Sequence, residues 1–190
     1  MTDLPIVAFR SAHEWRVWLK GRHATSPGVW LKIAKMGLGL KSVTYDQALD
    51  VALCFGWIDG QKAGFDERYW LQRFSPRRSR SKWSRVNRER AVRLTERGEM
   101  HAAGLREVAR AKADGRWEAA YAGQGTATVP EDLQRALEEN PKAQAFFLAL
   151  DRLNRYAILY RIGDAKRPET RAKRIERFVQ MLARNEKIYG

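Results

Sequence analysis

An arginine- and serine-rich stretch is the part of the sequence best suited to bind an anion. Between residues 77 and 97 the chain carries nine Lys or Arg against two acidic residues, Glu89 and Glu96. The first part, RFSPRRSRS, is predicted to be extended or a loop, because Pro76 and the serines interrupt any helix. A helix is predicted from Ser84 as its N-cap to a stop at Gly98.

The chemistry at this corner would be electrostatic. Arg77, Arg78, Arg80 and Lys82 repel one another unless an anion or an acidic group compensates them. Neighbouring serine hydroxyls and the free amides at a helix start would add hydrogen-bond donors, and Trp83 would add a flat surface. These features together predict an anion-binding corner.

The helix that follows also has a simpler explanation. Its arginines at positions 90, 93 and 97 form one stripe, and its apolar residues are few. Such a helix is expected to pack weakly and to expose much of its surface. A solvated charged face therefore stays open as an alternative to an anion site.

A predicted hairpin over residues 56–76 supplies the second polar group. In its strand GWIDGQ, period-two alternation places Trp57, Asp59 and Gln61 on one face. A carboxylate there needs a cation, and Arg73 or Arg77 is the expected partner. The alternatives are a buried ion pair that fixes the fold and the floor of a polar pocket.

Other chemistries have little support in the sequence. The single cysteine, Cys54, lies in an apolar helical run and is expected to be a buried, inert thiol that can form no intramolecular disulfide. The three histidines lack metal-ligand spacing, so neither a metal nor a cofactor is expected. GLGLKS lacks the spacing of a phosphate-binding loop and is interpreted as a plain turn. No catalytic motif is present, which leaves open whether the protein is an enzyme.

Composition points to a folded, strongly basic protein. The chain has 190 residues, 44% hydrophobic and 11% aromatic content, seven Trp, and a formal net charge of +14. Such a charge favours phosphates, acidic proteins or anionic surfaces as partners. The N-terminus lacks a signal-peptide pattern and no apolar run is long enough to span a membrane, so a cytoplasmic protein is expected.

The predicted elements define an α+β fold, in which a small antiparallel sheet packs with helices and an all-helical C-terminal region follows. Two capping boxes and 3.6-residue periodicity mark the first helices. A glycine-rich loop before Pro130 is the expected boundary between an α+β domain at 1–126 and a helical region at 127–190. We expect helices at 12–23, 45–55, 84–97, 101–114, 130–140, 141–150, 153–165 and 168–186, and three strands in 28–36 and 56–76.

Three blocks resemble a known bacterial family. CFGWIDGQ, YWLQRFSPRRSRSKWSRVN and AKRPETRAKRIERFVQMLARNE are similar to the bacteriocin-protection, or OmpD-associated (YdeI-like), family over roughly residues 5–187. The resemblance implies a cytosolic stress-response protein linked to tolerance of cationic antimicrobial peptides, without an agreed reaction. Its pattern falls on Trp57, Ile58, Asp59, Gly60, Arg73, Phe74, Pro76, Arg77, Arg78, Trp83, Ser84 and Asn87, and on Arg167, Pro168, Glu169, Thr170, Arg171 and Arg174.

Three functions remain open from the sequence. The first is a binding protein for an anionic small molecule or an acidic protein segment. The second is a nucleic-acid-binding protein, although no helix-turn-helix, zinc-finger or RNP pattern is present. The third is an enzyme with Asp59 as general base beside an anionic substrate. The residues expected to bind the ligand are Trp57, Asp59, Arg73, Arg77, Arg78, Trp83, Ser84 and Asn87.

Overall fold

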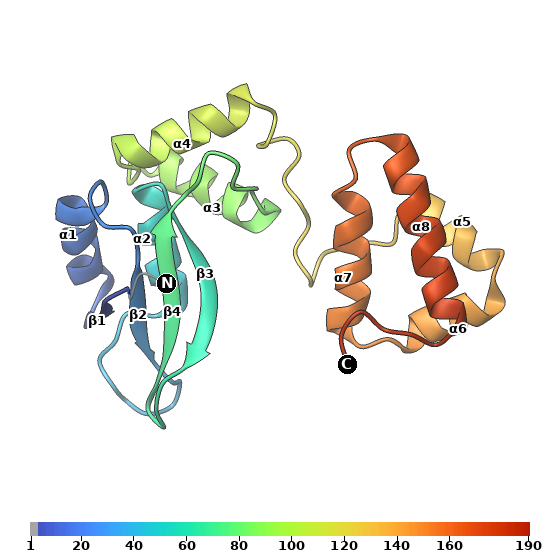
Figure 1. Ribbon diagram of the computed structural model, residues 1–190. Helices are drawn as coiled ribbons and strands as arrows, with labels where there is room; N and C mark the ends of the chain where they lie inside the picture. The colour runs from blue at the N-terminus through green and yellow to red at the C-terminus, as the bar shows by residue number, and fades with distance from the viewer. Residues whose placement is uncertain (1–3) are drawn as a thin grey trace. The chain divides into compact units, whose positions relative to one another are not determined.

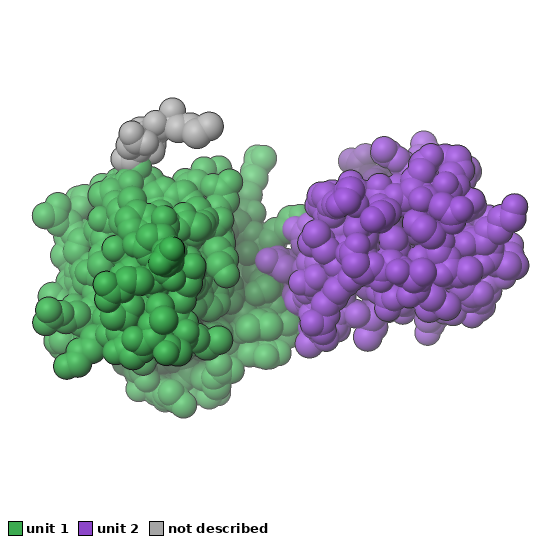
Figure 2. Space-filling view, turned by 90° about the horizontal axis from the view of Figure 1, so that it is seen from below, with its two compact units in different colours: residues 1–120 green, residues 121–190 purple. Residues whose placement is uncertain are grey.

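The chain divides into two compact units. The computed structural model describes residues 4–190, and the units comprise residues 1–120 and 121–190 (Figure 2). Each unit has its own cluster of buried apolar side chains. Each is therefore described by itself.

The N-terminal unit is built on a four-stranded sheet in the order β1-β2-β4-β3 (Figure 1). β2, β4 and β3 are antiparallel neighbours, as the sequence predicts, and this sheet with its helices confirms the α+β class. The sequence predicts three strands, and the sheet has a fourth: a short β1 that pairs in parallel with β2. Its three residues are too few for a period-two pattern. The strands are β1 (Ile6–Ala8), β2 (Val29–Ala34), β3 (Trp57–Gly64) and β4 (Tyr69–Pro76).

Within residues 4–120, four helices complete this unit: α1 (Ala12–Arg22), α2 (Tyr45–Cys54), α3 (Arg85–Glu96) and α4 (Ala102–Ala113). Local capping explains their starts. The Ser11, Thr44 and Ser84 hydroxyls each accept a hydrogen bond from the backbone N–H three residues later, and at Thr44 both halves of a capping box form.

An aromatic core joins the first helices to the sheet. Trp15 and Trp57 are fully buried with ring centroids 6.2 Å apart, and Phe74 packs 5.8 Å from Trp15. Both indole N–H groups are satisfied, because Trp15 donates to the carbonyl of Ala48 and Trp57 to that of His23. The core thus uses the high tryptophan content without leaving these donors unpaired.

The C-terminal unit is all helical, as predicted. Its core includes Leu133, Leu137, Ile158, Ile162 and Leu182. The four helices are α5 (Glu131–Glu138), α6 (Pro141–Ala149), α7 (Arg152–Gly163) and α8 (Pro168–Ala183), of which α8 contacts each of the other three. Asn154 is buried in α7, and its side-chain oxygen accepts hydrogen bonds from the last turn of chain at residues 188–189.

Candidate functional site

A tight turn forms the corner between β4 and α3. The N–H of Arg77 donates to the carbonyl of Gly56 at 2.9 Å, which ties the corner to the end of α2. The N–H of Ser81 then donates to the carbonyl of Arg78, and the Ser81 hydroxyl accepts from the N–H of Arg78. The turn therefore has a backbone fixed by its own hydrogen bonds.

Arg77 and Trp83 form the buried inner side of the corner. The guanidinium carbon of Arg77 lies 3.7 Å from the centroid of the Trp83 ring, and Arg77 donates to the carbonyl of Lys82. Arg77 is 6% exposed and Trp83 is 1% exposed, and the Trp83 and Trp117 rings meet at an angle of 64° with their centroids 4.9 Å apart. A partner at the surface would therefore meet the side chains around this pair rather than the indole face.

The outer face of the corner is cationic. Arg78, Arg80, Lys82 and Arg85 are exposed, and no acidic residue occurs between positions 76 and 88. We call these four side chains the basic corner. Ser84 and Asn87, both predicted to bind a ligand, form the cap of α3, because the Asn87 N–H donates to the Ser84 hydroxyl at 3.1 Å.

Arg116 supports the corner from the end of α4, a contribution that the sequence did not reveal. It donates to the carbonyl of Ser81 at 2.7 Å and pairs with the carboxylate of Asp114. The hydrogen bond from Arg116 lowers the pKa of Asp114, which favours the ionised carboxylate. This carboxylate compensates the charge of Arg116. The two segments lie 35 residues apart, which explains why no local pattern predicts the contact.

Arg90 is also neutralised, which corrects the expected arginine stripe. Its guanidinium binds the carboxylates of Asp46 and Asp50 on α2, the latter at 2.8 Å, and its side chain is only 17% exposed. α3 thus docks on α2 through Arg90 together with the buried Ala91 and Leu94. The expectation of a weakly packed helix is wrong on this face, and Arg93 and Arg97 remain exposed.

Asp59 accepts a hydrogen bond from the Tyr45 hydroxyl at 2.9 Å. The expected pairing with Arg73 or Arg77 is not formed, because Asp59 lies opposite Phe74 on the helix-covered face. Arg73, one residue along β4, points to the other face. Burial, followed by the charge of Asp59, raises the pKa of Tyr45, so this tyrosine stays protonated.

A bulge in β3 breaks the expected alternation of this hairpin. The pairing register shifts between Asp59 and Lys62, which removes Gln61 from the face of Asp59. The buried side-chain amide of Gln72 donates to the carbonyls of Gly60 and Gln61 at 2.9 and 3.2 Å. The predicted site residues therefore separate: Trp57 lies in the core, Asp59 beside α2, and Arg77, Arg78, Trp83, Ser84 and Asn87 at the corner.

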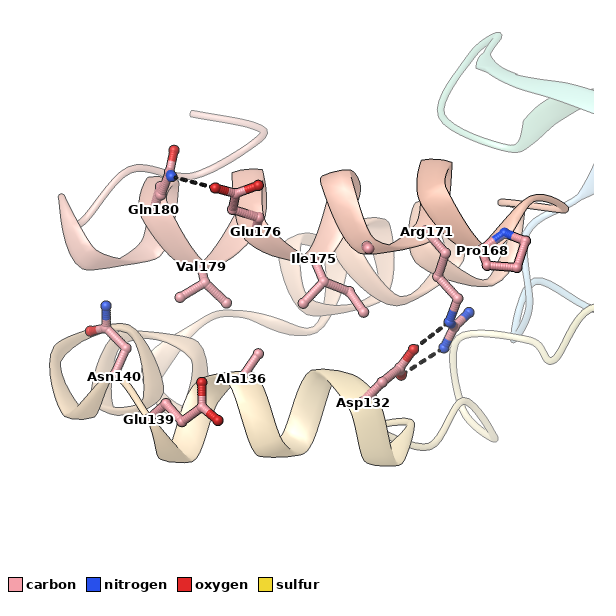
Figure 3. Close-up of a pocket in the computed structure, with 11 residues that line it drawn as sticks. Asp132, Ala136, Glu139, Asn140, Pro168, Arg171, Ile175, Glu176, Val179 and Gln180 are labelled. Carbon is pink, nitrogen blue, oxygen red and sulfur yellow. Dashed lines mark hydrogen bonds and ion pairs between the residues drawn. The ribbon is translucent and has the colours of Figure 1, made fainter.

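The C-terminal unit has a groove of about 620 Å³ between α5 and α8 (Figure 3). Ala136, Ile175 and Val179 line its apolar part. The Arg171 guanidinium donates two hydrogen bonds to the Asp132 carboxylate, at 2.5 and 2.8 Å. Arg171 belongs to the tail block of the sequence resemblance. In this structure it joins two helices of the unit.

Two negative findings apply to the described part of the chain. Within residues 4–190, no group of three or more His, Cys, Asp or Glu side chains could hold a metal ion. No helix in the same range is both long and apolar enough to cross a membrane.

The fold and the basic corner define a two-unit α+β protein with a cationic surface on its N-terminal unit. Residues 7–107 match the family described as a domain of unknown function, DUF8412, and the chain belongs to this family. Residues 126–185 match the family described as bacteriocin-protection, YdeI or OmpD-associated, which confirms the resemblance there. The first two sequence blocks lie within the other match. No curated protein and no solved structure matches the chain.

Proposed function

We propose that this is a binding protein that holds an acidic protein segment, or a comparable anionic ligand, on its basic corner. The supporting observation is a difference between its arginines. Arg90 and Arg116 have carboxylate partners, whereas the exposed Arg78, Arg80 and Arg85 have none among residues 4–190. Three unneutralised guanidinium groups, two on the fixed turn and one at the first residue of α3, favour bidentate binding of carboxylates.

An extended polyanion fits this surface better than a stacked ligand. Exposed ion pairs contribute little individually, about 0–1 kcal/mol each, so several cations must act together. The burial of Trp57 and Trp83 removes the aromatic faces that would stack on nucleic acid bases. Phosphate contacts remain available, and nucleic acid is therefore the competing partner in the test. The role of Asp59 as a general base stays a prediction.

The family match gives this proposal a biological context. Residues 126–185 match a family described by bacteriocin protection, and a cationic toxin would be repelled by a chain of net charge +14. We infer that any role in tolerance of cationic antimicrobial peptides proceeds through an acidic partner rather than through capture of the toxin. The predicted cytosolic location is part of the same proposal.

The experiment compares a labelled poly-glutamate peptide with single-stranded and duplex oligonucleotides over a salt series. The corner variant carries Arg78→Ala, Arg80→Ala and Arg85→Ala. Its matched control removes the same charge from three other exposed arginines of the unit, through Arg93→Ala, Arg97→Ala and Arg106→Ala. We expect the corner variant to lose at least tenfold in peptide affinity and the control about twofold.

Equal losses in the two variants would contradict the proposal, because net charge alone would then explain binding. Tighter oligonucleotide binding that is lost only in the corner variant, with a salt slope near 0.9 per phosphate on duplex, would instead establish nucleic acid as the partner.

A further inference from the structure

A second cavity lies beside the hairpin, on the helix-covered side of the sheet. Its volume is about 1040 Å³, at the upper end of the range for small-molecule pockets. The start of α2, the loop 35–43 and the adjoining ends of β2, β3 and β4 surround it. The side chains that matter here are Ile33, Leu38, Leu40, Tyr45, Lys62 and Trp70.

Two aromatic rings give the cavity flat walls. The rings of Tyr45 and Trp70 are half-buried, with centroids 6.2 Å apart and planes tilted by 40°. The hydrogen bond from the Tyr45 hydroxyl to Asp59 fixes the tyrosine ring. Together with Ile33 and Leu40, these rings suit a planar, mainly apolar molecule.

The charge within the cavity is positive. The Lys62 ammonium lies 4.4 Å from the centroid of the Trp70 ring, and within residues 4–190 no carboxylate pairs with it. Lys35 also lines the cavity. The lining carboxylate is that of Asp46, and Arg90 already binds it. An anionic group would therefore find, over the face of the Trp70 indole, a cation that no carboxylate of the described residues compensates.

The GLGLKS motif lies in the loop that lines the cavity, and the conformation of this loop explains its two glycines. Gly37 and Gly39 both have positive φ, at 83° and 62°, which lets the short loop turn twice. Its apolar side chains lie partly in solvent, with Met36 98% and Leu38 48% exposed. Met36 and Leu38 therefore add apolar surface to the rim of the cavity.

We propose that this cavity binds a small, planar, mainly apolar molecule that carries one anionic group, such as an aromatic carboxylate or sulfonate. The ring system lies against Tyr45 and Trp70, and Lys62 pairs with the anion. This site goes beyond the proposed function and shares no residue with the basic corner. Each of the two proposals can therefore be disproved without affecting the other.

The test uses two fluorescent probes with the same aromatic system. 8-Anilinonaphthalene-1-sulfonate carries the anion, and N-phenyl-1-naphthylamine lacks it. We expect Lys62→Gln to weaken sulfonate binding about tenfold and to change binding of the uncharged probe less than twofold. Lys32→Gln is the matched control, because Lys32 also lies over aromatic rings, 4.2 Å from that of Tyr69, but on the other face of β2.

A second variant tests the aromatic wall. Trp70→Leu is expected to weaken both probes, while the corner variant with Arg78→Ala, Arg80→Ala and Arg85→Ala leaves both unchanged. Circular dichroism of each variant verifies that it is folded. Sulfonate binding that survives Lys62→Gln, or that falls equally with Lys32→Gln or with the corner variant, would overturn the proposal.

Discussion

At the residue scale, burial and pairing decide which charged side chains are available to a partner. Arg77, Arg90 and Arg116 look the same in sequence as Arg78 and Arg80. The first three are buried or half-buried and are held by a ring, a carbonyl or a carboxylate. The exposed two keep their charge unneutralised within the described residues. The number of arginines in the sequence is therefore larger than the number available to bind a partner.

The Asp132–Arg171 pair should make the C-terminal unit sensitive to acid. The hydrogen bond from Arg171 lowers the pKa of Asp132 below its ordinary value. A carboxyl with a lowered folded-state pKa stabilises the fold above its unfolded pKa of about 3.9, and this contribution is lost as the pH falls through the folded-state pKa. Because both side chains are partly exposed and solvent screens the pair, we expect Asp132→Asn to cost at most about 1 kcal/mol at pH 7 and to reduce the acid dependence below pH 4.

Urea unfolding followed by far-ultraviolet circular dichroism from pH 7 to pH 2 measures this effect. Glu169→Gln removes an exposed carboxylate from the start of the same helix, α8, and serves as the control. An Asp132→Asn variant with the acid dependence of the wild type would show that the pair contributes nothing.

At the element scale, close backbone contact sets how α4 packs on α2. Gly104 is buried in α4, and a Cβ atom there would lie 2.3 Å from the carbonyl oxygen of Cys54 and 2.7 Å from that of Leu53. The N–H of His101 donates to the same Cys54 carbonyl at 3.1 Å. α4 can therefore approach the end of α2 because position 104 has no side chain.

Two glycine-to-alanine substitutions should have opposite effects on stability. Gly104→Ala places its methyl group against backbone that cannot give way, so we expect a loss of about 2 kcal/mol or more. Gly21→Ala, in α1, meets nothing within 4 Å and should gain about 0.5 kcal/mol from the better helix propensity of alanine. Chemical denaturation monitored by Trp fluorescence measures both. A neutral Gly104→Ala would mean that α4 moves away at little cost.

At the scale of the whole molecule, the two units differ in charge and in aromatic content. Residues 1–120 carry 23 Lys or Arg against 13 Asp or Glu, whereas residues 121–190 carry 13 against 9. The N-terminal unit therefore holds +10 of the net +14. All seven tryptophans also lie in it. The unit that carries the basic corner thus supplies most of the attraction for an anion.

The C-terminal unit should fold when expressed alone as residues 121–190. Its helices enclose their own core. The side chain of Asn154 also fixes the C-terminal residues, because it accepts hydrogen bonds from the N–H groups of Ile188 and Tyr189. We expect a helical circular dichroism spectrum and a cooperative thermal transition, although a 70-residue unit has only modest stability. Phe178→Ala, which truncates a buried side chain, should lower the midpoint strongly. A fragment without cooperative melting would contradict this expectation.

The sequence by itself determined the elements whose signals are local. Capping at Ser11, Thr44 and Ser84, the apolar periodicity of the helices and the alternation in Val29–Ala34 placed most helices and the antiparallel strands within a few residues. These signals depend on hydrogen bonds and side-chain spacing within about one helical turn or one strand, so no distant contact is needed to interpret them.

Only the tertiary structure decided which of these residues meet. The parallel pairing of β1, the bulge that separates Asp59 from Gln61, and the Tyr45–Asp59 bond all depend on segments that lie apart in the chain. The same holds for Arg90, whose two carboxylates lie 40 and 44 residues away. A charged side chain has the same local pattern whether it is paired or exposed, and its neighbours in space fix the difference.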